Sequence, residues 1–443
     1  MEIRELYDRY LECGGRVSTD TRTLEGGEMF IALKGENFDG NAYAMKALDA
    51  GAACAVVDSD SEVARSGDAR IIAVEDSFAA LQSLANWHRN HCEGPDGKRI
   101  TVLGLTGTNG KTTTKELIRR VLSTTLVTVA TEGNLNNDIG VPLSLLKLRK
   151  GTQIAVIEMG ANHPDDISKL VKVCEPDYGL ITNVGKAHLL GFGSFEGVQR
   201  AKGQLYDYVR EHRGSVFLNA DDPVLCSMAA AREDLPTILY GPRYDRVELL
   251  QATDTEPLLR FRIGDRIIRT HLSGAYNLNN ALAALCVGAY FGVPFEKAAE
   301  AIESYVPANN RSQMQRSPCG NLLILDAYNA NPSSMAAALD NLSAFSSGRR
   351  VALLGDMREL GDDSLKEHAN VVRRIADSGI KAYLVGEEFR KALDAEGRPA
   401  NVKGWYATSS ELAAALAAAP LSDSVVLVKG SRGIQMEKVV PEL

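Results

Sequence analysis

The stretch Gly107-Thr-Asn-Gly-Lys-Thr112 contains the residue types that bind a nucleoside triphosphate. An apolar segment precedes it, residues 100–105, and apolar residues recur at helical spacing over residues 117–122. Glycines in such a strand-to-helix turn leave backbone N–H groups pointing at one spot, which the helix dipole makes positive. Lys111 would reach the outer phosphates, and the Thr112 hydroxyl would hold a magnesium ion. We therefore predict a triphosphate site here, although Leu105 stands where a strict Walker A pattern has glycine.

Three charged residues follow later strands or helices of the same region. Glu158 ends the predicted strand 153–157, where it could hold magnesium or simply be a solvated strand end. His188 lies just past the predicted strand 178–182, at the edge where ligands gather, but a structural role is equally compatible with its position. Lys202 lies on the next predicted helix, and from the residues alone it is a surface lysine.

Asparagines mark two further candidate regions. The stretch from Thr131 to Pro142 contains three of them, and Asn134 or Asn136 would either recognise a ligand or cap the next helix. Asn277 opens an alanine-rich helix and could be only its N-cap. Polar clusters also follow three predicted strands near the C-terminus, which places a functional edge there. These clusters are Asp326-Ala-Tyr-Asn-Ala-Asn-Pro332, Gly355-Asp-Met-Arg-Glu-Leu-Gly361 and Lys429-Gly-Ser-Arg432.

A polar cluster, Ser18-Thr-Asp-Thr-Arg22, lies just before the first apolar strand. Asp20 could bond nearby backbone in an ordinary turn. Alternatively, the cluster is a binding lip in which Arg22 or Lys34 meets an anionic ligand.

The elements that position these residues alternate between strand and helix. Residues 1–98 indicate a small α/β unit, with strands at 29–33, 53–57 and 71–74 and a helix over 77–90 capped by Ser77. Residues 99–308 indicate a mostly parallel sheet with helices on both faces, followed by a hairpin that turns at Gly264-Asp265. From residue 309 the alternation restarts, with strands at 322–325, 351–354, 383–385 and 425–428.

Composition and charge exclude several classes of protein. The 443 residues are 45% hydrophobic and 24% charged, as in globular enzymes of two or three domains. A formal net charge of −8 argues against a dedicated nucleic-acid or anionic-membrane surface. The N-terminus lacks an apolar signal-type core, and no apolar run approaches the ~18 residues that span a bilayer. Seven scattered cysteines without a C-x-x-C pair indicate reduced thiols in a cytoplasm. We also expect the protein to be a monomer.

The motifs, taken in order, resemble those of the Mur ligase family. They are STDTR, ALKGENFDGN, TGTNGKT, TEGNLNNDIGVP, EMGANHPDDI, NVGKAHLLGFGS, AKGQLYD, DAYNANPSSM, LGDMRELG and KGSR, and they span nearly the whole chain. The resemblance implies an α/β fold of three domains. These would be a small N-terminal UDP-substrate-binding domain (1–98), a central P-loop ATPase with a mostly parallel sheet (99–308) and a C-terminal Rossmann-like ligase domain (309–443).

The resemblance also implies the activity, substrates and cofactors. The carboxylate of UDP-N-acetylmuramoyl-tripeptide would receive the γ-phosphoryl group of ATP, and the amine of D-alanyl-D-alanine would then displace phosphate. Two magnesium ions are expected. Thr112 and Glu158 would hold the first, and His188 and a carbamylated Lys202 would hold the second. Lys111, Glu158, His188 and Lys202 would be the catalytic residues. The third residue of the stem peptide is not specified by any motif.

The resemblance implies three sets of binding residues. ATP would contact Gly107, Thr108, Asn109, Gly110, Lys111, Thr112, Thr113, Asn277 (at adenine), Arg311 and Asp326. The muramoyl-peptide would contact Asn134, Asn136 and Asn137, and the uridine diphosphate would contact Ser18, Asp20, Arg22, Lys34, Asp39 and Gly40. Relatives often carry two acidic residues where this chain has Leu325 and Asp326.

Four alternative functions agree less well with the sequence. The Mur ligase that adds the third stem residue usually carries an Asp-Asn-Pro-Arg signature, which is absent here. Folylpolyglutamate synthase would not be expected to contain EGNLNN or the long N-terminal region. A P-loop kinase or GTPase would leave two further α/β domains unused, and the guanine-reading N-K-x-D motif is missing. A silent nucleotide-binding scaffold would not need Lys111, Glu158, His188 and Lys202 together.

Overall fold

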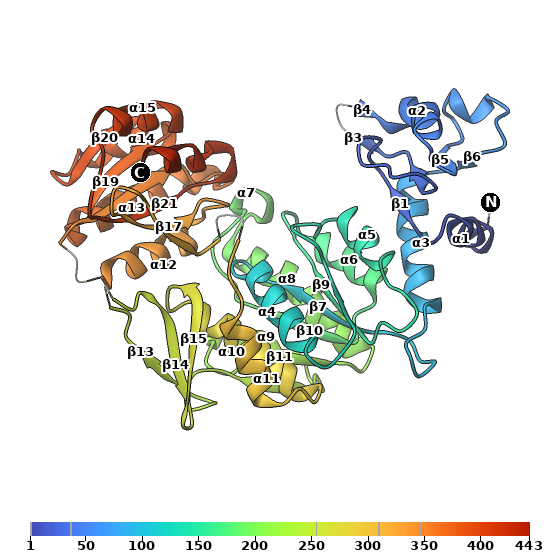
Figure 1. Cartoon of the computed structure of the whole chain (residues 1–443), viewed down its shortest axis with the longest axis horizontal. Helices are drawn as coiled ribbons and strands as arrows, with labels where there is room; N and C mark the ends of the chain where they lie inside the picture. Colours follow the sequence, from blue (N-terminus) through green and yellow to red (C-terminus); the bar gives the residue numbers. More distant parts are fainter. Residues whose placement is uncertain (1, 36–37, 254, 309–310, 346–347) are drawn as a thin grey trace.

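The computed structural model of the chain describes residues 2–35, 38–253, 255–308, 311–345 and 348–443. Three parallel or mostly parallel sheets follow one another along these residues. Figure 1 shows the N-terminal elements and the C-terminal elements at opposite ends of the long axis, with the central sheet between them. The predicted α/β class is confirmed. The division at residues 98 and 308 stays a prediction, and residues 309–310 lie outside the described ranges.

The N-terminal sheet has four parallel strands in the order β1-β2-β5-β6. Its strands are β1 (Val17–Ser18), β2 (Met29–Ile31), β5 (Cys54–Asp58) and β6 (Ile71–Val74), and a separate hairpin is formed by β3 (Lys34–Gly35) and β4 (Phe38–Asp39). Its helices are α1 (Ile3–Glu12), α2 (Ala44–Asp49), α3 (Ser77–His91) and the short 3-10 turns η1 (Gly40–Tyr43) and η2 (Val63–Arg65). The predicted cap of α3 is wrong. Asp76, not Ser77, accepts the N–H groups of Phe78 and Ala79, because its side chain precedes the first helical residue.

The central sheet has six strands in the order β12-β11-β10-β7-β9-β8, all parallel. Its strands are β7 (Thr101–Thr106), β8 (Thr128–Ala130), β9 (Ile154–Glu158), β10 (Tyr178–Ile181), β11 (Ser215–Asn219) and β12 (Thr237–Tyr240). Its helices are α4 (Lys111–Leu122), α5 (Gly140–Leu145), α6 (Asp166–Cys174), α7 (Leu189–Phe192), α8 (Phe195–Glu211) and α9 (Pro223–Ala230). Because β7 lies between β9 and β10, the segments that follow these three strands meet at one edge.

An antiparallel sheet and two helices complete the central region. Strands β13 (Glu248–Leu250), β14 (Leu258–Ile263) and β15 (Arg266–Ser273) pair in that order. Ile263 pairs with Arg266, so the predicted turn at Gly264-Asp265 is confirmed. Helices α10 (Asn277–Tyr290) and α11 (Phe295–Glu303) follow.

The C-terminal sheet has the order β16-β17-β21-β18-β19-β20, with only β16 antiparallel among the described strands. Its strands are β16 (Gln313–Arg316), β17 (Leu322–Asp326), β18 (Arg350–Gly355), β19 (Lys381–Val385), β20 (Val402–Tyr406) and β21 (Val425–Lys429). Its helices are α12 (Pro332–Ser343), α13 (Ser364–Ser378), α14 (Glu387–Glu396), α15 (Ser409–Ala418) and the 3-10 turns η3 (Gly361–Asp363), η4 (Arg432–Ile434) and η5 (Met436–Glu442). The four predicted strands are confirmed, whereas β16 and β20 were not predicted.

The two joints between the sheets differ in chemistry. One apolar core continues from the N-terminal to the central sheet, and it includes Leu84 of α3 and Leu145 of α5. By contrast, the apolar clusters of the C-terminal sheet contain no described residue that precedes Met314 in the sequence. Their apolar core is therefore separate from that of the central sheet. The C-terminal joint is polar instead: Lys186 pairs with Glu367 at 2.9 Å. A polar joint is easier to open than a continuous apolar core, because little hydrophobic surface is exposed when it separates.

Candidate active site

The predicted strand–turn–helix at the phosphate loop is confirmed. Strand β7 ends at Thr106 and helix α4 begins at Lys111. Gly110 caps that helix with φ +78°, a left-handed conformation that favours glycine. A Cβ on Gly107 would lie 1.9 Å from Oγ1 of Thr182. Both glycines are therefore required by the backbone, and the loop leaves the N-terminus of α4 open to an anion.

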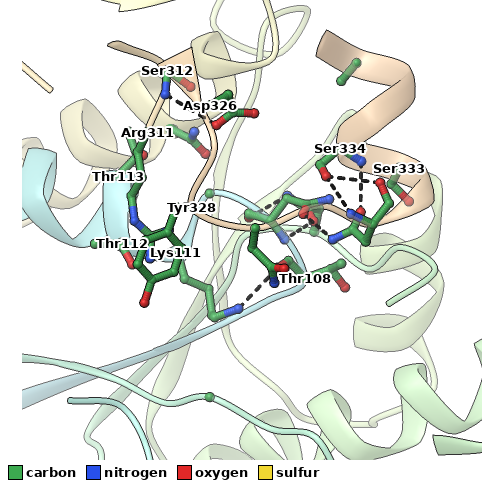
Figure 2. Close-up of a pocket in the computed structure, with 18 of the residues that line it drawn as sticks. Thr108, Lys111, Thr112, Thr113, Arg311, Ser312, Asp326, Tyr328, Ser333 and Ser334 are labelled. Atoms are coloured by element: carbon green, nitrogen blue, oxygen red, sulfur yellow. Dashed lines mark hydrogen bonds between the residues drawn. The ribbon is translucent and has the colours of Figure 1, made fainter. Parts of the chain in front are cut away.

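A cavity of about 540 Å³ lies in front of this loop. Figure 2 shows that residues of the phosphate loop and residues after position 310 line it together. Of the residues predicted from the sequence, it is lined by Thr108, Asn109, Gly110, Lys111, Thr112, Thr113, Asn134, Asn136, Glu158, His188, Asn277, Arg311 and Asp326. The fold thus gathers at one place side chains that are more than 200 residues apart in sequence.

The ammonium of Lys111 is folded back onto its own loop. Its Nζ donates to the carbonyl oxygens of Gly107, at 2.8 Å, and Thr108, at 3.2 Å. Burial lowers the pKa of Lys111, and the nearby Arg311 lowers it further, while Glu158 opposes the shift. An anion bound in the cavity would offset the cost of burying this cation.

Glu158 is buried and only partly paired, so the solvated strand-end interpretation is wrong. Its Oε1 accepts hydrogen bonds from Nδ2 of Asn136, at 2.8 Å, and from Oγ1 of Thr112, at 3.2 Å. Its Oε2 has no hydrogen-bond donor among the described residues, although Nζ of Lys115 lies 3.7 Å away. A buried carboxylate oxygen beside a hydroxyl is a donor set that fits a hard divalent cation.

The described residues contain no cluster of three or more His, Cys, Asp or Glu side chains suited to a metal. Among the described residues, the candidate metal ligands here are the hydroxyl of Thr112 and the carboxylate of Glu158, with no further acidic side chain grouped with them. This sparse set fits magnesium, which commonly takes its remaining ligands from water and substrate phosphates.

His188 is held in an unusual backbone conformation at the same edge. Its φ is +51°, and its Nδ1 is hydrogen-bonded to the carboxylate of Glu359 from the C-terminal region. Burial lowers the pKa of His188, with the charges of Lys111 and Lys202 acting in the same direction and Glu359 opposing them. A neutral imidazole is the form that binds a metal.

Lys202 lies on α8 and is only 2% exposed, so the surface position expected from the residues alone is wrong. Its Nζ lies 5.9 Å from the ring centroid of Phe192, and within the described parts of the chain no carboxylate pairs with it. Burial, aided by the charge of Lys111, shifts the pKa of Lys202 well below its usual value. An amine in this setting is easily held neutral.

Asn277 lies in the first turn of α10 and does not cap it. The residue at the cap position is Tyr276, while Nδ2 of Asn277 donates to the carbonyl of Ser273 at 2.7 Å. The N-cap interpretation of Asn277 is therefore wrong. Oδ1 of Asn277 accepts from Nδ2 of Asn280 at 2.8 Å, which fixes the orientation of the amide at the cavity wall.

Arg311 and Asp326 enter the cavity from the C-terminal side. The guanidinium of Arg311 lies 3.5 Å from the centroid of the Tyr328 ring, a cation–π contact. Oδ2 of Asp326 accepts from Nζ of Lys429 at 2.5 Å. Both charges are thus oriented by neighbours on the same domain edge.

The three asparagines of residues 134–137 separate into two groups. Asn134 and Asn136 line the cavity, whereas Asn137 does not. Oδ1 of Asn137 instead accepts from the N–H of Gly140 at 2.9 Å, at the start of α5. Ile139 occupies the cap position of α5 and the helix has no side-chain cap hydrogen bond, so the alternative in which Asn134 or Asn136 caps it is wrong.

The six predicted N-terminal residues lie away from the cavity, since none of them lines it. Asp20 pairs with Arg22 at 2.6 Å, and Oγ of Ser18 donates to the carbonyl of Asp20 at 3.0 Å, as in the turn interpretation. Nζ of Lys34 lies 3.0 Å from Asp58. Asp39 caps η1, and a Cβ on Gly40 would lie 2.4 Å from the carbonyl oxygen of Leu33.

Several cavity residues were not predicted individually. They are Asn183, Tyr328, Asn329, Asn331, Ser333, Ser334, Glu359 and Lys429. Most belong to the polar clusters that follow the C-terminal strands, and those clusters were the available signal. Asn183 begins the motif NVGKAHLLGFGS, but the motif did not predict its contact: its Oδ1 accepts from the N–H of Asn109 at 3.0 Å.

Comparison with known proteins finds one family along the chain. The profile of the Mur ligase middle domain matches residues 105–288, that of the Mur ligase glutamate ligase domain matches residues 310–432, and that of the Mur ligase family catalytic domain matches residues 16–89. No helix among the described residues has the length and apolar character to cross a membrane.

Individual relatives match from end to end. The UDP-N-acetylmuramoyl-tripeptide–D-alanyl-D-alanine ligase of Bacillus subtilis is 33% identical, over 96% of this chain and 92% of that protein. The protein of the same name from Escherichia coli is 34% identical over 96% and 93%. Among solved structures, MurF from Acinetobacter baumannii has a TM-score of 0.82 at 33% identity, over 97% of this chain and 93% of that one. MurF ligase from Thermotoga maritima, solved in complex with ADP, has a TM-score of 0.81 at 28% identity, over 96% of both chains.

Proposed function

Because the chain belongs to the Mur ligase family, we propose that it joins D-alanyl-D-alanine to UDP-N-acetylmuramoyl-tripeptide at the expense of ATP. The observation that carries this proposal is the match, over 96% of the chain, to relatives named UDP-N-acetylmuramoyl-tripeptide–D-alanyl-D-alanine ligase. The match therefore includes the regions proposed for the uridine diphosphate and the muramoyl-peptide as well as the phosphate loop.

The reaction requires activation of a poor acyl donor. An oxygen of the tripeptide carboxylate attacks the γ-phosphorus of ATP, the bond to the β-phosphate oxygen breaks, and ADP leaves. The dipeptide amine then attacks the acyl carbon, phosphate leaves with the C–O electron pair, and the nitrogen loses a proton. The protein contributes mainly by positioning the reactants and neutralising charge.

The ATP site is the cavity in front of the phosphate loop. The backbone of Gly107 to Thr113 and the ammonium of Lys111 would cradle the phosphates. Asn277 would contact adenine, and Arg311 and Asp326 would close the site from the C-terminal side. The cavity lined by Lys111, Asn277, Arg311 and Asp326 supports these roles.

Magnesium would be held in two places. Thr112 and Glu158 would hold the first ion, which the unpaired Oε2 of Glu158 supports. His188 and a carbamylated Lys202 would hold the second. Magnesium would supply positive charge to the phosphoryl group as it transfers.

The burial of Lys202 supports its modification. A neutral amine attacks carbon dioxide and releases one proton, forming a carbamate. This reaction converts a buried amine, for which no carboxylate partner is found among the described residues, into an anionic metal ligand. The negative charge of the carbamate would attract the metal ion, which an amine or ammonium would not.

The uridine diphosphate end would lie against the N-terminal sheet, at Ser18, Asp20, Arg22, Lys34, Asp39 and Gly40. The peptide would extend from there to Asn134, Asn136 and Asn137. The N-terminal and C-terminal sheets lie at opposite ends of the molecule (Figure 1), which suits an elongated substrate.

We further propose that the enzyme is a cytoplasmic monomer, with one domain for each of residues 1–98, 99–308 and 309–443.

The test is a reconstituted reaction with the purified full chain. Phosphate release should require ATP, magnesium, UDP-N-acetylmuramoyl-tripeptide and D-alanyl-D-alanine together, and mass spectrometry should detect the UDP-muramoyl-pentapeptide. Omitting the dipeptide should abolish stoichiometric product. Equal turnover with a single amino acid in place of the dipeptide would overturn the assignment.

A further inference from the structure

A second cavity, of about 280 Å³, adjoins the ATP cavity. It shares five lining residues with the larger one, namely His188, Tyr328, Asn329, Asn331 and Glu359. Its remaining wall contains Arg358 and Arg432. The volume is just below the roughly 300–1,000 Å³ that small-molecule pockets occupy, which suits a ligand much smaller than a nucleotide.

The two arginines come from loops that the fold ties together. Arg358 follows β18 and Arg432 follows β21, and these two strands are parallel neighbours. The backbone N–H of Arg358 donates to Oγ of Ser431 at 2.9 Å, and the N–H of Ser431 donates to the carbonyl of Asp356 at 3.1 Å. A Cβ on Gly433 would lie 2.6 Å from Nη1 of Arg358. The Arg358 guanidinium therefore passes directly against the loop that carries Arg432.

Neither guanidinium is neutralised by the protein. Throughout the described ranges, Arg358 donates from its backbone N–H, and its side chain makes no hydrogen bond or ion pair. Among the described residues, the guanidinium of Arg432 interacts with Tyr328, with Nη1 3.4 Å from the hydroxyl and the guanidinium carbon 5.4 Å from the ring centroid. Both arginines line one cavity, and neither has an acidic partner among the described residues. Two such cations in a chain whose net charge is −8 favour an anionic ligand. Guanidinium groups match the planar geometry of a carboxylate.

The opposite sign of charge lies where the two cavities meet. Glu359 lines both of them, and its carboxylate is hydrogen-bonded to His188. The small cavity is thus positive at the Arg358 and Arg432 wall and negative toward the ATP cavity. A short zwitterionic peptide would match this polarity with its carboxylate at the arginines and its amino group toward Glu359.

We propose that the 280 Å³ cavity binds the incoming dipeptide, and that Arg358 and Arg432 hold its terminal carboxylate. This inference rests on the function proposed above. In this orientation the amine of the dipeptide faces the ATP cavity, where the acyl phosphate would form. The arginines then act as specificity residues that require a free carboxylate at the far end of the nucleophile.

The experiment compares Arg358→Gln, Arg432→Gln and the double variant with wild type in the full chain. Arg390→Gln is the matched control, because Arg390 lies on α14 and does not line either cavity. Initial rates are measured with varied D-alanyl-D-alanine, then with varied UDP-N-acetylmuramoyl-tripeptide and varied ATP. Circular dichroism and ADP binding report whether each variant is folded.

The KM for D-alanyl-D-alanine should rise roughly tenfold to a hundredfold for each single variant, as expected for loss of a charge-assisted hydrogen bond. The KM values for the other two substrates should stay within about twofold, and the control should match wild type. An unchanged KM for the dipeptide would overturn the proposal. A rise confined to the UDP substrate would also overturn it, by assigning the arginines to a carboxylate of the tripeptide.

A second measurement needs no variant. Wild type should use D-alanyl-D-alaninamide at least about tenfold less efficiently than the free acid, because the amide lacks the negative charge. Folded arginine variants should lose this discrimination. Equal use of acid and amide by wild type would overturn the proposal while leaving the ligase function intact, whereas failure to ligate either compound would refute the function itself.

Discussion

Nδ2 of Asn331 donates a hydrogen bond of 2.8 Å to Oδ1 of Asn109, and this bond joins the C-terminal sheet region directly to the phosphate loop. Asn331 is also the N-cap of α12, since its own Oδ1 accepts the N–H of Ser334 at 2.9 Å. Asn109 is held from the other side by Asn183. One side chain therefore links the position of the C-terminal region to the geometry of the loop that would bind ATP.

Asn331→Ser should keep the cap of α12 but remove the hydrogen bond to Asn109. Serine is a good N-cap, so the melting temperature should change little, but its shorter side chain cannot reach Asn109. Loss of one neutral hydrogen bond should reduce kcat/KM for ATP roughly twofold to tenfold. Asn109→Ala should cause a similar loss, and the double variant should be no worse than either single one. Strictly additive losses would show that the bond does not carry the coupling.

Lys111→Ala should reduce ATP-dependent phosphate release by at least about a hundredfold, because the transferring phosphoryl group would lose a preorganised positive charge. Lys98→Ala serves as the control, since that side chain is 82% exposed and remote from the cavity. Circular dichroism should be unchanged in both. Retention of more than about a tenth of the activity by folded Lys111→Ala would contradict the proposed role.

Chelation of magnesium should abolish activity, and added magnesium should restore it. Glu158→Gln keeps the shape of the side chain but removes the charge that faces Thr112 and Lys115. We expect the magnesium concentration for half-maximal rate to rise at least about tenfold. Thr112→Ser should behave like wild type, because the hydroxyl is retained. An unchanged magnesium requirement in Glu158→Gln would remove this residue from the metal site.

Lys202→Ala should lose most activity and regain part of it when acetate or formate is added. A small carboxylate can enter the space left by the side chain and supply the oxygen ligands of the carbamate. Lys111→Ala is the comparison variant, since carboxylate cannot replace its positive charge. Rates measured over a range of formate concentrations are the readout. A folded Lys202→Ala enzyme that no carboxylate rescues would count against the carbamate.

The N-terminal region should lose stability in acid, because the ionised carboxylate of Asp58 stabilises it. Partial burial opposes ionisation, but hydrogen bonds from Ser77, Asn41 and Lys34 outweigh it and lower the pKa of Asp58 to about 2. This carboxylate therefore contributes stability that is complete above its ordinary pKa of roughly 3.9 and is lost as the pH falls toward 2.

Asp58→Asn tests this dependence. At about pH 7 the variant should be less stable by about 1–3 kcal/mol, because the new side chain would present an amide to the donors of Ser77 and Asn41. The difference should shrink between about pH 4 and pH 2, since wild type also loses its charge there. Thermal unfolding followed at each pH is the measurement. A difference that is independent of pH would mean that the Asp58 charge contributes nothing.

The local features of this protein could be predicted from the sequence because short-range physics determines them. The glycines of residues 107–110 end β7 and start α4, since their conformations are costly for other residues. The turn at Gly264-Asp265 and the alternation of strand and helix follow from equally local patterns. Parallel strands then had to bring Glu158 and His188 to the edge that carries Lys111.

Features that depend on distant neighbours emerged only from the tertiary structure. Lys202 has the sequence context of a surface lysine, yet packing of α8 buries it near Phe192. Asn136 could have capped α5 on sequence grounds, yet its amide donates to the carboxylate of Glu158, 22 positions away. Arg358 and Arg432 line one cavity because β18 lies beside β21, although the two residues are 74 positions apart in the sequence. Burial, charge and accessibility belong to the assembled surfaces, and no spacing along a single chain segment encodes them.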